Sequence, residues 1–233
     1  MAISSHEKIV IIGAGCFGIS TAYHLSQRGF TDITVIDRSD SLPAKDASSN
    51  DFNRIVRTSY SDNFYTTFAK EAIGTWKNRQ VWEDDSYHES GVLVLSSSSS
   101  PGSYVDDSYT NDRNQGSRVD ILPDGEAVRR VFPPEVPVSP FHNTRGYMNY
   151  DGGWANAGQA VSYLTSKVKL MGVKVHGGKT VKRLRRRDNA ATTGIECEDG
   201  TMFEASLVVV ATGSWTPSVF PDLGLKEKCL ATG

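Results

Sequence analysis

Three glycines near the amino terminus have the spacing of a phosphate-binding turn. In the stretch "IVIIGAGCFGIS" (residues 9–20) they stand as Gly13-x-Gly15-x-x-Gly18, directly after an apolar run. A second apolar run, "ITVID", ends in Asp37, 19 residues after Gly18. A strand, a glycine turn, a helix and a second strand that ends in an acidic residue are the parts of a βαβ unit that binds a dinucleotide.

Each position of this motif has its own physical reason. We expect Gly13 to allow the tight turn, Gly15 to let the backbone approach a pyrophosphate, and Gly18 to let helix and strand pack closely. The first helical N–H groups offer hydrogen bonds and a partial positive charge to phosphates. Asp37 is placed to accept a hydrogen bond from a ribose hydroxyl. The same predicted site includes Ala14, Phe17 and Arg38. The alternative is a structural glycine turn with a coincidental aspartate.

The wider hydrophobic pattern indicates the elements that must hold this site. We expect strands at residues 8–12, 33–37, 91–97, 173–175 and 180–186, a hairpin at 198–200 and a last strand within 205–215. Helices are expected at 17–29, 63–80 and 155–171, with a short one within 124–132. Residues 96–140 are rich in serine and proline and are interpreted as an insertion or a piece of a second domain, with long loops.

A basic run, "KTVKRLRRR" (residues 179–187), has two interpretations. It could be a patch for RNA, or a half-exposed strand with Val181 and Leu184 facing inward and its charges solvated. We favour the strand because the chain has a net charge of −2, which gives no electrostatic footprint for nucleic acid.

Composition excludes further classes of partner. No run approaches the roughly 18 to 20 apolar residues that a membrane span requires. Cys16, Cys197 and Cys229 are odd in number and far apart, which argues against a disulfide framework and a metal site. We therefore expect an intracellular protein, cytoplasmic or peroxisomal, without nucleic-acid, membrane or metal partners. The sequence leaves the oligomeric state open.

A late apolar strand bears on which dinucleotide is bound. "LVVVATGSW" (residues 207–215) resembles the second signature of flavoproteins with two dinucleotide-binding motifs, in which this strand passes near FAD. Its residues Ala211, Gly213 and Trp215 are the predicted contacts. Together with the early glycine turn, this resemblance favours FAD over NAD.

Three stretches make the resemblance more specific. "ASSNDFNRIVRTSY" (47–60), "GYMNYDGGWANAGQAV" (146–161) and "VVATGSWTPSVFPDL" (209–223) resemble the FAD-dependent amine oxidases of the D-amino-acid-oxidase superfamily. The branch concerned holds the sarcosine, pipecolate, saccharopine and fructosyl-amino-acid oxidases. The similarity extends over essentially all 233 residues and is weakest at 96–140.

The resemblance implies roles for particular residues. Ser48 and Asn53 match cofactor contacts, and Val175 matches a backbone contact on the adenine side of FAD. Arg54 matches a basic residue beside the isoalloxazine ring, where a positive charge stabilises the anionic reduced flavin. Arg57 matches an arginine that clamps the substrate carboxylate, which the guanidinium fork suits. Without the resemblance, both arginines read as surface ion-pair formers.

The resemblance also implies a fold and a division into domains. We expect an α/β chain with a Rossmann-like FAD-binding domain formed by residues 1–90 and 145–218. A second, incomplete antiparallel-sheet substrate domain comprises 91–144 and 219–233. Members of the family are close to twice as long, so a truncated amino-terminal half is expected.

Two functions remain open at this point. The first is an FAD-dependent oxidase of a secondary amine or N-substituted amino acid, which uses oxygen and yields an imine and hydrogen peroxide. Fructosyl-amino-acid oxidases tend to have lysine and serine at the positions of Arg54 and Arg57, so this chain leans towards a simpler substrate of the sarcosine, pipecolate or saccharopine type. The second is a catalytically inert FAD-binding protein. An NAD-dependent dehydrogenase is a third reading of the same βαβ unit.

Overall fold

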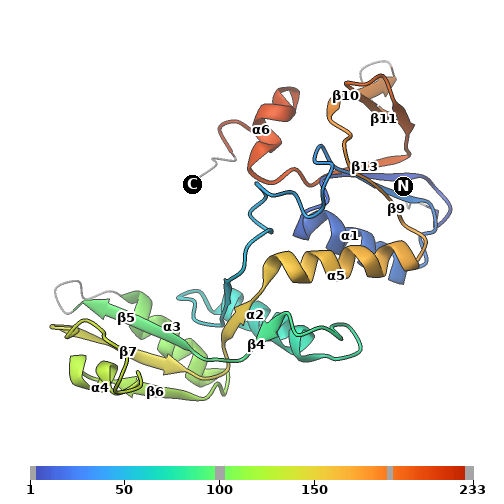
Figure 1. Cartoon of the computed structure of the whole chain (residues 1–233). Helices are drawn as coiled ribbons and strands as arrows, with labels where there is room; N and C mark the ends of the chain where they lie inside the picture. The colour runs from blue at the N-terminus through green and yellow to red at the C-terminus, as the bar shows by residue number, and fades with distance from the viewer. Residues whose placement is uncertain (1–3, 98–102, 188–190, 229–233) are drawn as a thin grey trace. The chain divides into compact units, whose positions relative to one another are not determined.

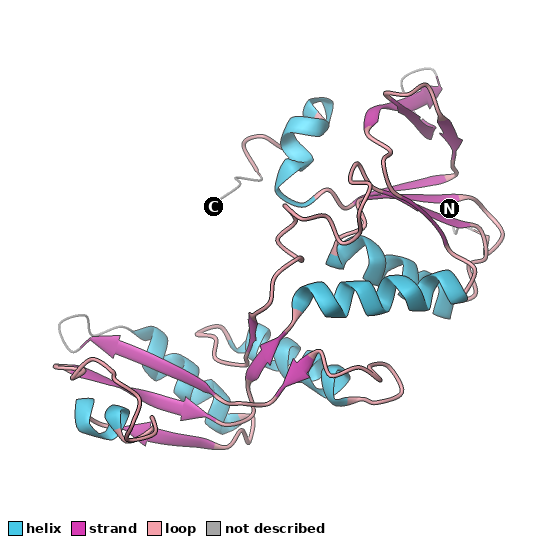
Figure 2. Cartoon of the chain, viewed as in Figure 1, coloured by secondary structure: helices cyan, strands magenta, loops and turns pink. Residues whose placement is uncertain are grey.

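A computed structural model describes residues 4–97, 103–187 and 191–228 of the chain. The chain forms two compact units, which we describe separately (Figures 1 and 2). The first unit comprises Met1–Phe52 and Ala157–Gly233, and the second comprises Asn53–Asn156. Cys229 lies outside the described residues.

A parallel sheet forms the centre of the first unit. Its strand order is β13-β1-β2-β9, with bounds Leu207–Val210, Ile9–Ile12, Ile33–Ile36 and Lys174–His176. All residues of β1 and β2 are buried, as expected for parallel strands covered on both faces. Helices α1 (Cys16–Gln27) and α5 (Ala157–Leu170) pack against each other on one side of this sheet (Figure 1).

The other face of the parallel sheet packs against a smaller antiparallel sheet. Strands β10 (Val181–Arg187), β11 (Ala191–Cys197) and β12 (Met202–Glu204) form it in sequential order. Val10, Ile12 and Ile36 share a core with Val181 and Ile195. Short helical turns η1 (Gly213–Trp215), α6 (Thr216–Val219) and η2 (Pro221–Leu223) follow β13, and buried Phe220 joins the same core.

The basic run is a strand, as predicted. Val181 is buried and Leu184 packs on the same core. Residues three apart face opposite sides of a regular strand, but the ladder between β10 and β11 is irregular between Val181 and Arg183. A bulge of this kind shifts the alternation by one residue and lets both side chains face inward.

The second unit is built on two antiparallel sheets. One has the order β3-β8-β4, with bounds Arg54–Val56, Gly153–Ala155 and Tyr87–His88. The other has the order β5-β7-β6, with bounds Val92–Ser97, Thr144–Asn149 and Val119–Leu122. Helices α2 (Asn63–Lys77), α3 (Ser103–Asn114) and α4 (Gly125–Arg129) complete this unit.

The predicted α/β class, with a Rossmann-like part and a second antiparallel part, is confirmed. Long loops were expected through residues 96–140, but α3 and β6 also lie there, whereas α4 matches the short helix predicted within 124–132. Strands β3, β4, β7 and β8 were not predicted, and α5 begins two residues later than expected because Ala155 pairs with β3 and β4. The compact units divide the chain after Phe52 and Asn156, so their boundaries differ from those of the expected functional domains, which remain a prediction.

In the part of the chain that the structure describes, no helix is long and apolar enough to cross a membrane. No cluster of three or more His, Cys, Asp or Glu residues with metal-binding geometry occurs among the described residues.

Candidate cofactor-binding site

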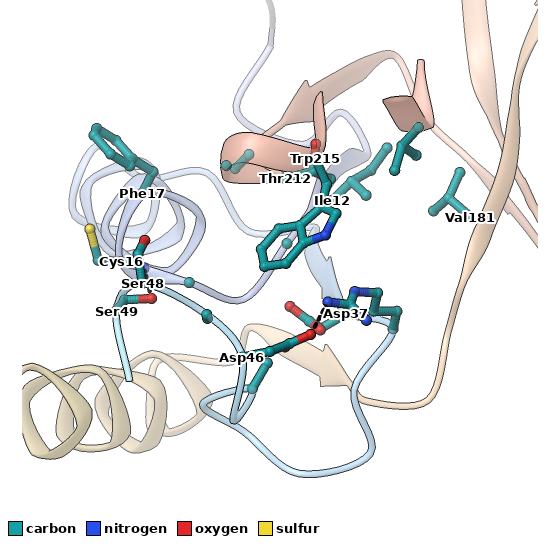
Figure 3. Close-up of a pocket in the computed structure, with 18 of the residues that line it drawn as sticks. Ile12, Cys16, Phe17, Asp37, Asp46, Ser48, Ser49, Val181, Thr212 and Trp215 are labelled. Atoms are coloured by element: carbon teal, nitrogen blue, oxygen red, sulfur yellow. Dashed lines mark hydrogen bonds and ion pairs between the residues drawn. The ribbon is translucent and has the colours of Figure 1, made fainter. Parts of the chain in front are cut away.

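The carboxyl ends of three parallel strands meet at one pocket of the first unit. Strand β1 lies between β2, the next strand along the chain, and β13, the last strand of this sheet. The order of the strands therefore reverses its direction beside β1. Ligands of open α/β sheets bind at such points. The pocket is lined by the glycine loop after β1, by residues 37–38 after β2, by residues 44–49, by residues 179–181 and by the turn after β13 (Figure 3).

The glycine loop can be built only with glycine at two of its positions. Gly13 has a φ of +106°, and a Cβ there would lie 2.4 Å from the carbonyl oxygen of Ala211. A Cβ on Gly18 would lie 1.8 Å from the carbonyl oxygen of Gly13. Gly15 differs, since a Cβ there would meet only the Ser49 hydroxyl at 3.1 Å. Gly13 and Gly18 therefore shape the turn, whereas Gly15 keeps the pocket side of the loop open.

The start of α1 presents backbone donors at this pocket. Gly15 caps the helix without a side-chain hydrogen bond, and no acidic residue stands in the first turn. The N–H groups of Gly15, Phe17 and Gly18 have no hydrogen-bond partner among the described residues, while that of Cys16 bonds the Ser49 hydroxyl at 3.3 Å. Such a helix terminus, with free N–H groups and the positive end of its dipole, is suited to an anion.

Asp37 lies directly after β2 at the floor of the pocket. Its Oδ2 accepts a hydrogen bond from the N–H of Ala14 at 2.8 Å, and its Oδ1 accepts one from the N–H of Ser39 at 2.9 Å. Each carboxylate oxygen has capacity for another donor. The carboxylate therefore fixes the glycine loop and can also receive a hydroxyl from a ligand.

An aromatic and charged wall faces Asp37. The indole of Trp215 points into the pocket towards Asp37 and Asp46 (Figure 3). Arg38 forms an ion pair with Asp46, and its guanidinium carbon lies 4.8 Å from the centroid of the Trp215 ring. A planar cation stacked on an indole and a flat aromatic surface offer contacts to a purine or a ribose.

Lys179 lines the pocket on a turn that sequence reasoning did not assign to it. Its backbone N–H donates to the carbonyl oxygen of Asp37 at 2.8 Å. Its Nζ donates to Asp199 at 2.6 Å and to the Thr201 hydroxyl at 2.9 Å. The ammonium group, together with the N–H and hydroxyl of Thr201, holds the pKa of Asp199 at about 2. These contacts fix the turn that follows β9 against the end of β2.

Cys16 also lines the pocket at the start of α1. Desolvation raises the pKa of Cys16 above its ordinary value. The thiol is therefore neutral at physiological pH, and it leaves the positive helix terminus available to another anion.

The structure brings most of the predicted cofactor residues together. Gly13, Gly15, Phe17, Asp37, Arg38, Ser48, Ala211, Gly213 and Trp215 line the pocket. Ala14 and Gly18 lie behind the lining, where they hold the loop. Val175 is not part of the lining. It sits in β9, where it pairs with Val35. Asn53, Arg54 and Arg57 belong to the second unit. The roles assigned to all of these residues remain predictions.

Several lining residues were missed by sequence reasoning. They are small or polar residues: Ala44, Asp46, Ala47, Ser49, Lys179, Thr180 and Thr212. One signal was present, because the run of small and polar residues after Asp37 predicts a loop at the carboxyl end of β2. Lys179 offered no comparable signal, since its position depends on pairing between β2 and β9.

In the second unit, Arg57 follows β3 and is half-buried. Its Nη1 donates to the hydroxyl of Tyr104 at 2.6 Å, and its guanidinium carbon lies 5.1 Å from the Tyr60 ring centroid and 5.8 Å from that of Tyr104. No acidic side chain pairs with Arg57 among the described residues. Arg54 begins β3, where it pairs with Ala155.

The first-unit pocket fits a dinucleotide on geometric grounds. It combines backbone donors at a helix amino terminus that have no partner in the described part of the chain, a carboxylate with spare acceptor capacity, and an aromatic wall. These suit a pyrophosphate, a ribose and a ring respectively. A loop in which Gly15 lacks a Cβ leaves room for a phosphate to approach the backbone.

Comparison with known proteins identifies the family. A model described as FAD dependent oxidoreductase (DAO) matches residues 8–230. L-saccharopine oxidase of Schizosaccharomyces pombe is 29% identical over 223 residues, covering 90% of this chain and 51% of the relative. An amino acid oxidase of Aspergillus flavus is 28% identical over 252 residues, covering 91% and 52%. The crystal structure of fructosyl amine:oxygen oxidoreductase (Amadoriase I) from Aspergillus fumigatus matches with a TM-score of 0.80 and 27% identity, covering 94% and 51%.

The chain thus spans about half the length of the relatives that it matches. The predicted preference for FAD over a nicotinamide cofactor is confirmed by the family match. Together with the α/β fold and the pocket at the glycine loop, this match shows that the chain belongs to the DAO family of FAD-dependent oxidoreductases.

Proposed function

We propose that this chain supplies the FAD-binding part, and part of the substrate site, of an oxidase acting on a secondary amine or N-substituted amino acid. The observation that carries the proposal is the pocket at the ends of β1, β2 and β13, whose donors, carboxylate and aromatic wall suit a dinucleotide. Family membership and the names of the relatives, which are amine and amino acid oxidases, support the reaction class.

The proposed cofactor contacts follow from the chemistry of each group. The N–H groups of the glycine loop and of the start of α1 would hold the pyrophosphate. Asp37 would accept a ribose hydroxyl, and Arg38 with Trp215 would lie against the adenosine end. When bound, the cofactor supplies a two-electron acceptor for the carbon–nitrogen bond, with oxygen reduced to hydrogen peroxide and the imine hydrolysed by water.

Two arginines have proposed roles towards the reacting groups. Arg54 would place a positive charge beside the flavin ring and stabilise negative charge there. Arg57 would bind the substrate carboxylate through its fork of donors and so fix the position of the α-carbon. Substrates of the sarcosine, pipecolate and saccharopine type all carry such a carboxylate. The cytoplasmic or peroxisomal location remains a prediction.

The proposal is tested by the visible spectrum of the purified chain after incubation with FAD and gel filtration. We expect retained flavin absorbance, followed by bleaching on anaerobic addition of sarcosine, pipecolate or saccharopine. Retained flavin that none of these amines bleaches would favour the inert FAD-binding alternative for this chain. Complete loss of flavin on gel filtration would contradict the cofactor site itself.

A further inference from the structure

The Arg57 guanidinium is a half-buried cation whose hydrogen bond and ring contacts within the described residues are with two neutral tyrosines, Tyr104 and Tyr60. The Tyr104 hydroxyl accepts its hydrogen bond at 2.6 Å and donates its own proton to the carbonyl oxygen of Ser59 at 2.5 Å. The Tyr60 ring contacts the guanidinium from another side. No carboxylate pairs with it among the described residues. A partly desolvated cation without a counter-ion gains most from an anionic ligand.

An apolar groove begins at this cation and lies wholly within the second unit. Its walls are Ile55 and Val56 of β3 and the aromatic rings of Tyr65 and Phe68 on α2. Ala69 and Ala72 also line it, and their small side chains leave the space open. The groove encloses about 250 Å³, near the lower end of the roughly 300–1,000 Å³ range of small-molecule pockets. It is therefore sized for a ligand no larger than one amino acid.

The walls of the groove are large apolar side chains that are exposed to solvent, although such side chains are usually buried. Phe68 is 63% exposed and Ile55 is 67% exposed. An apolar groove with one fixed charge at its end is complementary to an amphipathic molecule, whose charged group meets the cation and whose apolar part covers the walls.

We propose that this groove binds an amino acid whose carboxylate pairs with Arg57 and whose side chain is apolar, preferably aromatic. The inference rests on the proposed function and narrows its substrate class. Arg57 is the only charged residue among the described groove lining. A charged substrate side chain would lose hydration there without gaining an ion pair, whereas an aromatic ring can stack on Tyr65 or Phe68.

Ligand binding to the purified full chain, with FAD present, tests this selectivity. Calorimetry compares N-methylphenylalanine with sarcosine, which lacks the side chain, and with N-methylphenethylamine, which lacks the carboxylate. We expect N-methylphenylalanine to bind at least about 10-fold more tightly than either, because sarcosine lacks the apolar side chain and N-methylphenethylamine lacks the ion pair with Arg57. Sarcosine binding as tightly as N-methylphenylalanine, or no binding of any of the three, would overturn the proposal.

Three variants locate the binding to the groove. Ala72→Leu fills the groove at an exposed position. It should weaken the binding of N-methylphenylalanine about 10-fold while changing the affinity for sarcosine by less than about 2-fold. Arg57→Met should weaken the binding of both ligands that carry a carboxylate and leave the affinity for N-methylphenethylamine unchanged. Phe64→Ala is the matched control, since Phe64 stacks on Phe68 but does not line the groove. Circular dichroism checks that each variant is folded.

Two further readouts separate this proposal from its alternatives. Flavin retention and bleaching are measured on the same samples. If the chain binds flavin and oxidises sarcosine but shows no preference for an aromatic side chain, only the groove proposal is overturned. Sedimentation velocity reports self-association. If Ala72→Leu changes the association state but not ligand affinity, the groove is an interface between copies of this chain and the proposal fails.

Discussion

The carboxylate of Asp37 joins the end of β2 to the glycine loop through the N–H of Ala14, at 2.8 Å. Its second oxygen accepts the N–H of Ser39 at 2.9 Å. The acidic residue that closes the second strand therefore has a structural role within the protein. That role adds to the ribose contact proposed for it, because both oxygens retain acceptor capacity.

Replacing Asp37 by alanine should destabilise the first unit. The substitution leaves two backbone N–H groups without acceptors at a partly buried site, and each such group costs about 1–3 kcal/mol. We expect a loss of at least about 1 kcal/mol in the free energy of unfolding, measured by urea denaturation without FAD. Asp40→Ala, on an exposed residue of the same loop, is the control and should stay within about 0.5 kcal/mol of the parent. Equal effects of the two substitutions would refute the structural role.

Gly18 should tolerate no larger residue. In Gly18→Ala the new Cβ would start 1.8 Å from the carbonyl oxygen of Gly13, so α1 must move away from the turn. We expect a loss of about 1–3 kcal/mol or more in urea denaturation. Gly74→Ala is the opposite control, because a Cβ there meets nothing within 4 Å on α2. It should stabilise the chain by about 0.5–1 kcal/mol, since glycine is a poor helix former.

A substitution at Gly15 should affect cofactor binding much more than folding. The φ of −77° at Gly15 suits any residue, and a Cβ there would meet only one side-chain atom, the Ser49 hydroxyl, at 3.1 Å. Gly15→Ala should therefore change the free energy of unfolding by less than about 1 kcal/mol. If the loop contacts the pyrophosphate, the substitution should weaken the affinity for FAD by at least about 10-fold, because one close contact is lost. Quenching of flavin fluorescence measures the affinity, and an unchanged value would place the phosphates elsewhere.

The parallel core could be predicted from the sequence because its strands are apolar throughout and the glycine turn has a fixed spacing. Helix α3 could not, because its buried face is largely polar. Val105, Ser108 and Asp112 are its buried positions, and only the first is hydrophobic. Apolar residues therefore do not recur at helical spacing in this segment, and this pattern is the main sequence signal for a helix. The helix is held by its partners on β7, and these are far away in sequence.

The candidate site divides in the same way. The glycines, Asp37 and Trp215 belong to motifs with local spacing, and all lie in the first-unit pocket. Asp46 is held at the pocket by its ion pair with Arg38, and Lys179 by the hydrogen bond from its N–H to the carbonyl oxygen of Asp37. Contacts of this kind depend on the tertiary fold, and no local pattern encodes them.

The pair of Lys179 and Asp199 should make stability depend on acid pH. The Lys179 ammonium, first through its hydrogen bond, and the N–H and hydroxyl of Thr201 together lower the pKa of Asp199 to about 2. A group whose pKa is depressed by folding stabilises the protein above its unfolded pKa, about 4, and this contribution is lost as the pH falls through the folded value. Lys179→Met should therefore lower stability at neutral pH, with the difference from the parent shrinking between pH 4 and pH 2. Urea denaturation at several pH values measures it, and a difference independent of pH would contradict the assignment.

The second unit contains a buried carboxylate that is held by three donors. Oδ2 of Asp112 accepts hydrogen bonds from the Tyr147 hydroxyl at 2.8 Å, from the Asn149 amide at 2.8 Å and from the Ser59 hydroxyl at 3.0 Å. Burial raises the pKa of Tyr147, so its hydroxyl remains a donor across the neutral range. These contacts connect α3, β7 and the segment after β3.

Tyr147→Phe should weaken this network without disturbing the packing around it. It removes one donor from a buried acceptor while keeping the ring, so we expect a loss of about 1 kcal/mol. Tyr109→Phe is the matched control, because the Tyr109 ring packs edge-on against Tyr147 at 5.4 Å while its hydroxyl has no partner among the described residues. Its effect should stay within about 0.5 kcal/mol. Hydrogen exchange of the β7 amides reports the second unit directly, and faster exchange in Tyr147→Phe alone is expected. If both variants exchange alike, the stability of β7 depends on aromatic packing, and the bond to Asp112 contributes little.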